Sequence, residues 1–309
     1  MTEQQILGHT CAILTALTWA FAMVCFKLSG ERVAPLALNL FKNVVGLTLL
    51  VLTLWGMWAM GRGDGIAIIL DAPSRDIWLL LISGVIGIAM ADTLFFHALN
   101  LIGVGIVAIV DCLYSPFIIL FAFVMLSESL SWLQYIGAAL ILSAVLVSSR
   151  LKPPRNRTHK QLIAGILLGA AAMGLMAFGI VLVKPILTGF PLIWATTLRV
   201  FAGTLSLVVI ALVSRRRKDI FSAFRPATVW KWSLPGSFLG AYVSMVLWVA
   251  GFKYIDASVA SILNQTSTIF AIVLATVLLK EPFTRRKFAV LVLAMMGVAL
   301  VQLGDYLAH

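Results

Sequence analysis

The sequence predicts an all-α integral membrane protein with ten transmembrane helices arranged as two inverted five-helix repeats. First, 61% of its 309 residues are hydrophobic and 11% are charged, which leaves too few polar side chains to cover a water-soluble protein. Second, segments of the first half recur in the second half. Third, each half contains five apolar runs, and an odd number inverts the second half in the bilayer.

Each of the ten apolar runs is long enough to cross the membrane, because a helix of roughly 20 residues spans about 30 Å of hydrocarbon. In the first half the runs cover residues 7–28, 34–60, 76–99, 104–126 and 132–149. In the second half they cover residues 161–187, 191–213, 229–254, 257–279 and 287–303. We therefore predict a first repeat at 1–149, a basic linker at 150–160 and a second repeat at 161–309.

Two constant spacings relate the halves. The segment WAFAMVCFK at residues 19–27 recurs as MAFGIVLVK at 176–184, and this spacing of 157 also superposes Lys42 on Arg199 and Gly46 on Gly203. A spacing of 153 superposes later residues, namely Gly87 on Gly240, Ile102 on Ile255 and Glu128 on Glu281. A short difference in loop length accounts for the change of spacing.

The basic residues predict the orientation. Of 23 Lys and Arg residues, 17 fall in the odd-numbered loops or at the adjoining span ends, and two lie within spans. Four lie on the side that also carries the termini: Arg62, Arg75, Lys184 and Lys253. The positive-inside rule then predicts a multi-pass protein of the inner (plasma) membrane with both termini extracytoplasmic. The net charge of +11 is explained by these loops, so no nucleic-acid partner is expected.

Several motifs carry a resemblance to a known family. These are TALTWAFAMVCFK in the first span, Lys42 and Arg199 within the second and seventh spans, and the paired LSESLSWLQYIGAAL and LKEPFTRRKFAVLVL. Together they resemble EamA-type members of the drug/metabolite transporter superfamily. In that family the fourth helix of each repeat commonly ends in Leu-x-Glu, and Glu128 and Glu281 occupy these positions.

The resemblance implies that helices one to four of each repeat surround a central cavity, while each fifth helix is peripheral. It also implies export or exchange of small metabolites, amino acids among them. The repeats have diverged, since Met176 replaces Trp19 and Ile269 replaces Pro116. The substrate therefore does not carry over from the family.

Ionisable residues within the spans are Lys42, Asp92, His97, Asp111 and Arg199. Each costs several kcal/mol in hydrocarbon unless it faces a partner or a wet cavity. Lys42 and Arg199 lie at equivalent depths, so they either snorkel towards the interface or flank one cavity and bind a carboxylate. His97, near the end of its span, is favoured as an interfacial group over a proton relay.

The acids belong to the first repeat only, because Met245 and Asn264 stand where Asp92 and Asp111 stand in the first half. A buried carboxylate can exchange protons during transport, so both acids are candidate proton-coupling residues, and His97 is a third candidate. The alternative is a static ion pair, for example between Asp111 and Lys42.

Polar runs occupy equivalent places in the fourth and ninth spans, DCLYS at 111–115 and NQTST at 264–268. Residues three and four apart share a helix face, so each run presents a polar face that must contact protein or water. We predict the following substrate-binding set: Trp19, Asn39, Lys42, Asn43, Tyr114, Ser115, Arg199, Tyr242, Ser244, Trp248, Asn264, Ser267 and Thr268. Interhelical hydrogen bonding is the alternative role for these side chains.

Enzymatic signatures are missing from the sequence, which has no zinc-spaced His or Cys set, no Walker loop and no Gly-x-Ser-x-Gly elbow. We therefore expect no catalytic residue, metal or cofactor. The prediction is a secondary transporter, monomeric or homodimeric, that exports a small zwitterionic or amphipathic metabolite by alternating access, either proton-coupled or facilitative.

Two alternatives stay open: a membrane-embedded enzyme acting on a lipid-linked substrate, and an exchanger of phosphorylated metabolites that uses Lys42 and Arg199 as a phosphate clamp. The nearby Asp92 and Asp111 count against the clamp.

Overall fold

The computed structural model describes residues 3–61, 71–126, 131–148, 151, 157–225 and 230–308, and within these ranges it contains helices and connecting segments but no strand. The first half comprises α1 (Glu3–Gly30), α2 (Pro35–Ala59), α4 (Ser74–Gly84), the π-helix η1 (Val85–Met90), α5 (Ala91–Asp111), α6 (Tyr114–Leu126) and α7 (Trp132–Ser148). Glu128 and most of the predicted 150–160 linker lie outside the described residues.

The second half repeats this order with one added short helix, and with two helices where the first half has the single α5. It comprises α8 (His159–Leu187), α9 (Leu192–Val213), the short α10 (Arg217–Ser222), α11 (Trp230–Ser237), the π-helix η2 (Phe238–Val243), α12 (Ser244–Tyr254), α13 (Ala257–Gln265), α14 (Ser267–Leu278) and α15 (Arg285–Ala308).

Seven helical stretches of the described chain are long and apolar enough to cross a membrane: Glu3–Gly30, Pro35–Ala59, Ser74–Asp111, His159–Leu187, Leu192–Val213, Trp230–Tyr254 and Val259–Leu278. The 38-residue stretch Ser74–Asp111 covers all of the predicted span 76–99 and the beginning of the predicted span 104–126. Gly103 interrupts its helical backbone with φ 76° and ψ 170°, a conformation that glycine adopts without steric cost. The count of ten spans stays a prediction.

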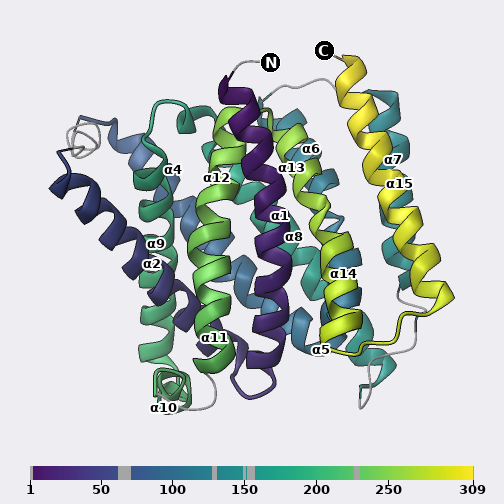
Figure 1. Cartoon of the computed structure of the whole chain (residues 1–309), viewed down its shortest axis with the longest axis horizontal. Helices are drawn as coiled ribbons and strands as arrows, with labels where there is room; N and C mark the ends of the chain where they lie inside the picture. The colour runs from purple at the N-terminus through teal and green to yellow at the C-terminus, as the bar shows by residue number, and fades with distance from the viewer. Residues whose placement is uncertain are drawn as a thin grey trace.

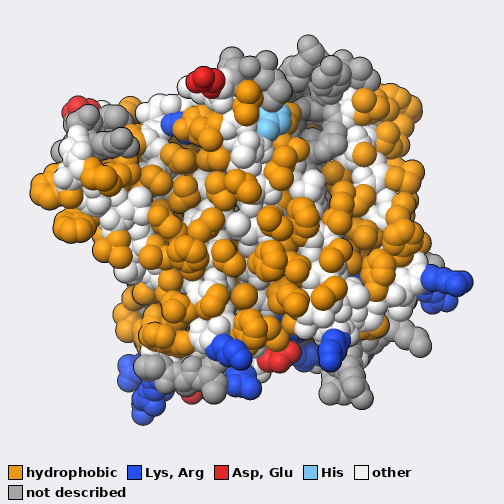
Figure 2. Space-filling model, in the orientation of Figure 1, with side chains coloured by type: hydrophobic (Ala, Val, Ile, Leu, Met, Phe, Trp, Pro, Cys, Tyr) orange, Lys and Arg blue, Asp and Glu red, His pale blue; other side chains and the backbone are white. Residues whose placement is uncertain are grey.

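The surface suits contact with lipid around its middle. Figure 2 shows hydrophobic side chains covering most of one face, and Trp55, Leu146 and Val213 are among the strongly exposed apolar residues. Lys and Arg gather mostly at one end of this face (Figure 2), and the two termini lie at the opposite end (Figure 1).

The two halves share their helix irregularities. The π-helices η1 and η2 begin at Val85 and Phe238, which are separated by the spacing of 153 found in the sequence. A π-helix leaves carbonyl groups without their usual helical partners. Asn39 of α2 satisfies two of them in η1, because its Nδ2 donates to the carbonyls of Ile88 (3.0 Å) and Ala89 (3.3 Å).

A second shared irregularity interrupts the predicted fourth and ninth spans. Tyr114 begins α6 after a turn at residues 112–113, and Ser267 begins α14 after a turn at Thr266. The first residues of α6 and α14 are again 153 apart. Side chains at both breaks contribute to the site described below.

Close contacts between the halves occur in exchanged pairs. Gly8 of α1 packs against Ile255, where a Cβ on the glycine would lie 2.7 Å from Ile255 Cγ2, and Gly165 of α8 packs against Ile102 in the equivalent manner. Only a small residue permits such an approach. The same exchange relates further contacts: Gly46–Ala241 with Gly203–Ile88, and Gly240–Ala22 with Gly87–Gly179.

The last helix of each half lies at the edge of the molecule. Helices α7 and α15 pack against each other at the right of Figure 1, the peripheral placement that the family resemblance implies. Gly297 permits this packing, because a Cβ there would lie 2.7 Å from the carbonyl oxygen of Gly137.

Glu281 connects the loop before α15 to the interruption in α5. Its carboxylate accepts hydrogen bonds from the amides of Val104 (2.9 Å) and Gly105 (3.0 Å), and from Lys287 Nζ (3.2 Å). These amides begin the helical segment that follows Gly103, so Glu281 satisfies donors that have no partner within the helix. The glutamate of the second Leu-x-Glu motif thus caps a helix of the first half.

Candidate functional site

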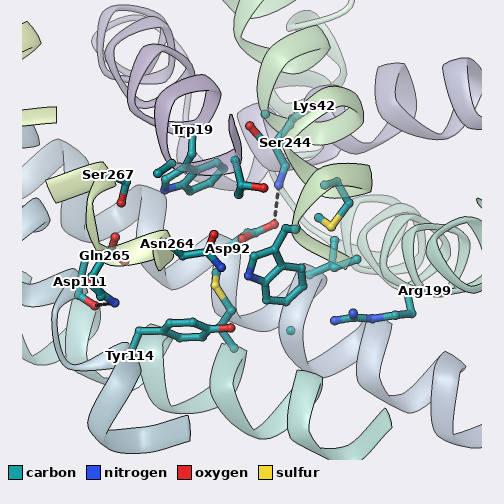
Figure 3. Close-up of a pocket in the computed structure, with 18 residues that line it drawn as sticks. Trp19, Lys42, Asp92, Asp111, Tyr114, Arg199, Ser244, Asn264, Gln265 and Ser267 are labelled. Atoms are coloured by element: carbon teal, nitrogen blue, oxygen red, sulfur yellow. Dashed lines mark hydrogen bonds and ion pairs between the residues drawn. The ribbon is translucent and has the colours of Figure 1, made fainter. Parts of the chain in front are cut away.

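A cavity lies where the two halves meet, with a volume of about 700 Å³ that includes space open to solvent. Figure 3 draws the 18 residues that line it. Twelve of them form six pairs related by the sequence spacings: Trp19 and Met176, Lys42 and Arg199, Gly87 and Gly240, Asp92 and Met245, Asp111 and Asn264, and Tyr114 and Ser267. Each half therefore contributes the same helix positions to one site.

Lys42 and Asp92 form an ion pair at this cavity, drawn as the dashed line in Figure 3. Their side chains are 1% and 4% exposed, and Lys42 Nζ also lies 5.6 Å from the ring centroid of Phe96. Lys42 therefore does not snorkel to an interface. The example of a Lys42–Asp111 pair was wrong, because Asp92 rather than Asp111 contacts Lys42.

Arg199 is equally buried, with 1% of its surface exposed, but it has no matching acid. In the part of the chain that the structure describes, no carboxylate oxygen lies within 4.0 Å of its guanidinium group. Its Nε and Nη1 have no hydrogen-bond partner. The guanidinium carbon lies 5.2 Å from the Trp248 ring centroid, a cation–π contact that offsets only part of the cost of burial.

Asp111 is the last residue of α5, directly before the break in the span, and it is half-buried. Its backbone carbonyl accepts a hydrogen bond from Gln265 Nε2 (3.2 Å). Among the described residues its carboxylate has no cationic group within 4.0 Å. Figure 3 shows Asp111 and Arg199 on opposite sides of the cavity.

Polar and aromatic groups complete the lining. The hydroxyl of Tyr114 and both amide atoms of Asn264 are buried without a hydrogen-bond partner. The rings of Tyr114 and Trp248 lie 6.5 Å apart. Ser244 Oγ lies 2.6 Å from Thr18 Oγ1. Buried polar atoms without partners are rare in proteins, so the Tyr114 hydroxyl and the Asn264 amide are available to a ligand or to water.

Five residues of the predicted binding set lie away from this lining: Asn39, Asn43, Ser115, Tyr242 and Thr268. Four of them form hydrogen bonds within or between helices: Asn39 bonds to η1, Asn43 Nδ2 to Asn39 Oδ1 (2.7 Å), Tyr242 to Thr53 (2.7 Å) and Thr268 to the Ala108 carbonyl (3.1 Å). Ser115 is buried, and its hydroxyl has no partner. His97 is exposed on α5.

The remaining members of the set do line the cavity: Trp19, Lys42, Tyr114, Arg199, Ser244, Trp248, Asn264 and Ser267, together with Asp92 and Asp111. Sequence reasoning omitted eight lining residues: Thr15, Ala16, Gly87, Ile88, Met176, Gly240, Met245 and Gln265. Two of them could have been found by the repeat alone, since Met176 and Met245 are the counterparts of the predicted residues Trp19 and Asp92.

Comparison with known families determines the class of this protein. The chain matches the EamA-like transporter family over residues 6–150 and again over residues 163–303. It belongs to the EamA-like transporter family. This member is therefore a multi-pass membrane transporter rather than an enzyme. As a transporter it acts on small molecules in a bilayer.

Similar proteins include one that is named a transporter. The protein PecM of Dickeya dadantii (strain 3937) is 25% identical over 235 residues, which cover 74% of this chain and 75% of PecM. An uncharacterized transporter of Synechocystis sp. (strain ATCC 27184 / PCC 6803 / Kazusa) is 24% identical over 261 residues, covering 84% and 73% of the two chains. A protein of known crystal structure shares the fold, with a TM-score of 0.67, 17% identity and coverage of 97% and 98%.

Proposed function

We propose that this EamA-like transporter exports a small zwitterionic metabolite, such as an amino acid, across the inner membrane by alternating access. The observation that carries this proposal is the charge arrangement in the cavity. The Arg199 guanidinium and the Asp111 carboxylate lie on opposite sides, and neither has an ionic partner within 4.0 Å among the described residues. Arg199 would bind a substrate carboxylate, and Asp111 would bind a substrate ammonium group.

Alternating access is supported by the relationship between the halves. The six pairs of lining residues and the exchanged contacts, such as Gly8–Ile255 with Gly165–Ile102, are what two inverted repeats around one site require. The separate family matches at 6–150 and 163–303 support the same division. We accordingly propose ten spans, with repeats at 1–149 and 161–309 joined by the linker at 150–160.

Coupling to protons fits the position of Asp111. A carboxylate that binds either a proton or a substrate ammonium group makes the two occupants exclude each other, which is negative coupling between them. Exchange of one for the other across the membrane then drives export. Asp92 is the less suitable proton site, because Lys42 already neutralises it.

The proposed orientation places the end rich in Lys and Arg in the cytoplasm and both termini outside. The unit can be a monomer or a homodimer. A phosphorylated substrate suits the cavity less well, because Lys42 is already paired with Asp92. Among the described residues, this leaves Arg199 as the one cation of the cavity without an ion-pair partner.

Transport by purified protein in liposomes tests this function. Vesicles preloaded with single zwitterionic amino acids should lose them faster than protein-free vesicles, and a pH gradient should change the rate. Replacing Gly87 by Trp should block transport, because the nearest atom to a Cβ at Gly87 is Arg199 Nη2 at 3.7 Å and a large side chain would fill the cavity.

Gly56→Trp is the matched control, since nothing lies within 4 Å of a Cβ at Gly56 and the added bulk would not enter the cavity. Efflux should be retained in Gly56→Trp. Equal efflux in the Gly87→Trp and wild-type proteins, or no efflux of any zwitterion, would reject the proposal.

A further inference from the structure

We infer that the residue paired with each repeat-related cation decides whether that cation binds substrate: Met245 leaves Arg199 free to bind the anionic group, whereas Asp92 removes Lys42 from that role. This inference rests on the proposed function, in which the substrate carries one carboxylate. It assigns Met245 and Asp92 as the residues that determine the charge specificity of the cavity.

The first step is the equivalence of four positions. Lys42 and Arg199 are related by the spacing of 157, and Asp92 and Met245 by the spacing of 153. All four residues line the same cavity. In the first half the cation and the acid are joined by a buried ion pair. In the second half the position of the acid is occupied by an uncharged thioether, so the same pair cannot form.

The second step is the environment of Arg199. Its backbone is fixed against α4, because a Cβ at Gly84 would collide with the Arg199 carbonyl group. The side chain is therefore held within the protein, with the guanidinium beside Trp248 and the Nε and Nη1 donors unpartnered. A guanidinium presents its donors in a planar fork that matches a carboxylate, so a bound anion would satisfy donors that the protein leaves free.

The third step is the environment of Lys42. Its ammonium group donates to Asp92 Oδ2, and both side chains are almost fully buried. A second anion at Lys42 would have to displace the Asp92 carboxylate or lie beside it, where like charges repel. The titratable groups around the cavity, namely Asp92, Asp111 and Tyr114, offer Arg199 no carboxylate within 4.0 Å. The cavity therefore accepts one anionic group, at Arg199.

Equilibrium binding to purified protein in detergent tests this assignment. The probes are leucine and phenylalanine, their amine-free acids 4-methylpentanoate and 3-phenylpropanoate, and their carboxylate-free amines 3-methylbutylamine and 2-phenylethylamine. Binding is measured by calorimetry on protein that is monodisperse and shows a cooperative thermal transition. The wild-type protein should bind the zwitterions and the acids.

Met245→Asp installs in the second half the acid that the first half has, so it should pair with Arg199 and weaken binding of both acids by at least about tenfold, as loss of one charge-assisted hydrogen bond does. Amine affinity should stay equal or rise. Arg199→Gln should cause a similar loss for the acids. Met245→Asn is the matched control: it has nearly the size of Asp but no charge to pair with Arg199, so the acids should bind about as tightly as in wild type.

Asp92→Asn predicts a gain, which a folding defect cannot imitate. It releases Lys42 as a second cation, so in the protein that folds the acids should bind several-fold more tightly. The inference would be overturned if the wild-type protein bound no acid, or if Met245→Asp and Arg199→Gln kept the wild-type affinity for acids. It would also be overturned if those variants lost affinity for acids and amines equally, or if Asp92→Asn bound acids no more tightly. If the wild-type protein transports zwitterions but the variants bind acids and amines as wild type does, this inference alone is rejected. Selective acid binding without transport rejects the proposed function alone.

Discussion

Lys42 on α2 and Asp92 on α5 form a buried ion pair beside a cavity in which Arg199 has no such partner. The two cations occupy equivalent positions in the repeats, yet one is neutralised by its neighbour and the other is not. This difference separates residues that maintain the helix packing from residues that are available to a substrate. It also leads to separate predictions for stability and for binding.

Removing one member of the ion pair should destabilise the protein. Lys42→Met leaves Asp92 buried without its cation, a change that typically costs about 3–5 kcal/mol. The double variant Lys42→Met/Asp92→Leu should recover most of the loss, because it removes both charges. Thermal unfolding in detergent measures each effect, and Arg199→Met is the comparison, since it leaves no carboxylate unpaired. Equal destabilisation by Lys42→Met and Arg199→Met would contradict this assignment.

Glu281 should stabilise the fold as a helix cap. Glu281→Ala leaves the amides of Val104 and Gly105 without their acceptor, and loss of a cap costs about 0.5–2 kcal/mol. Glu281→Gln keeps one acceptor oxygen and should lose less. Thermal unfolding distinguishes them, with Glu31→Ala as the control because Glu31 is exposed. A transition temperature for Glu281→Ala as high as that of the control would show that the cap contributes nothing.

Asp111 should carry the pH dependence of transport. Asp111→Asn cannot lose or gain a proton at this site, so a pH gradient should no longer drive transport in liposomes, while exchange of substrate for substrate stays measurable. Asp219→Asn is the control, because Asp219 lies exposed on α10. If the pH dependence of Asp111→Asn matches that of wild type, Asp111 is a structural residue and not the proton site.

Cysteine labelling can establish the orientation. The native cysteines Cys11, Cys25 and Cys112 are buried, so a membrane-impermeant maleimide should give a low background in intact cells. Gly189→Cys, in the loop between α8 and α9, should be labelled from outside. Lys218→Cys on α10, at the basic end, should be labelled only after the membrane is permeabilised. The reverse pattern would place the termini in the cytoplasm.

Much of the site could be predicted from the sequence because the repeat transfers information between the halves. Lys42 and Arg199, or Asp111 and Asn264, are related by a fixed spacing, and positions that are equivalent in two repeats meet at their common cavity. The same spacings relate the π-helices η1 and η2. Their existence could not be predicted, since an extra residue in a helical turn arises from packing and not from local propensity.

The sequence could not predict which polar residues of the spans face the cavity and which form hydrogen bonds between helices. Helical periodicity identifies a polar face that avoids lipid, but Asn39 bonds to η1 while Asn264 faces the cavity, and both are polar residues deep within a span. The partner of Lys42 was undetermined for the same reason. Asp92 and Asp111 both lie on α5, and only the packing of α5 against α2 decides which of them reaches the ammonium group.

The affinity of Arg199→Gln for a zwitterion tests the central claim most directly. The measurement compares wild-type and Arg199→Gln proteins for whichever amino acid wild type binds most tightly, normalised to folded protein. Gln keeps a donor and much of the length but removes the charge. Loss of a charge-assisted hydrogen bond worth roughly 1.5–3 kcal/mol should weaken binding by about one to two orders of magnitude, and Arg199→Lys should restore part of it. Wild-type affinity in Arg199→Gln would contradict the account.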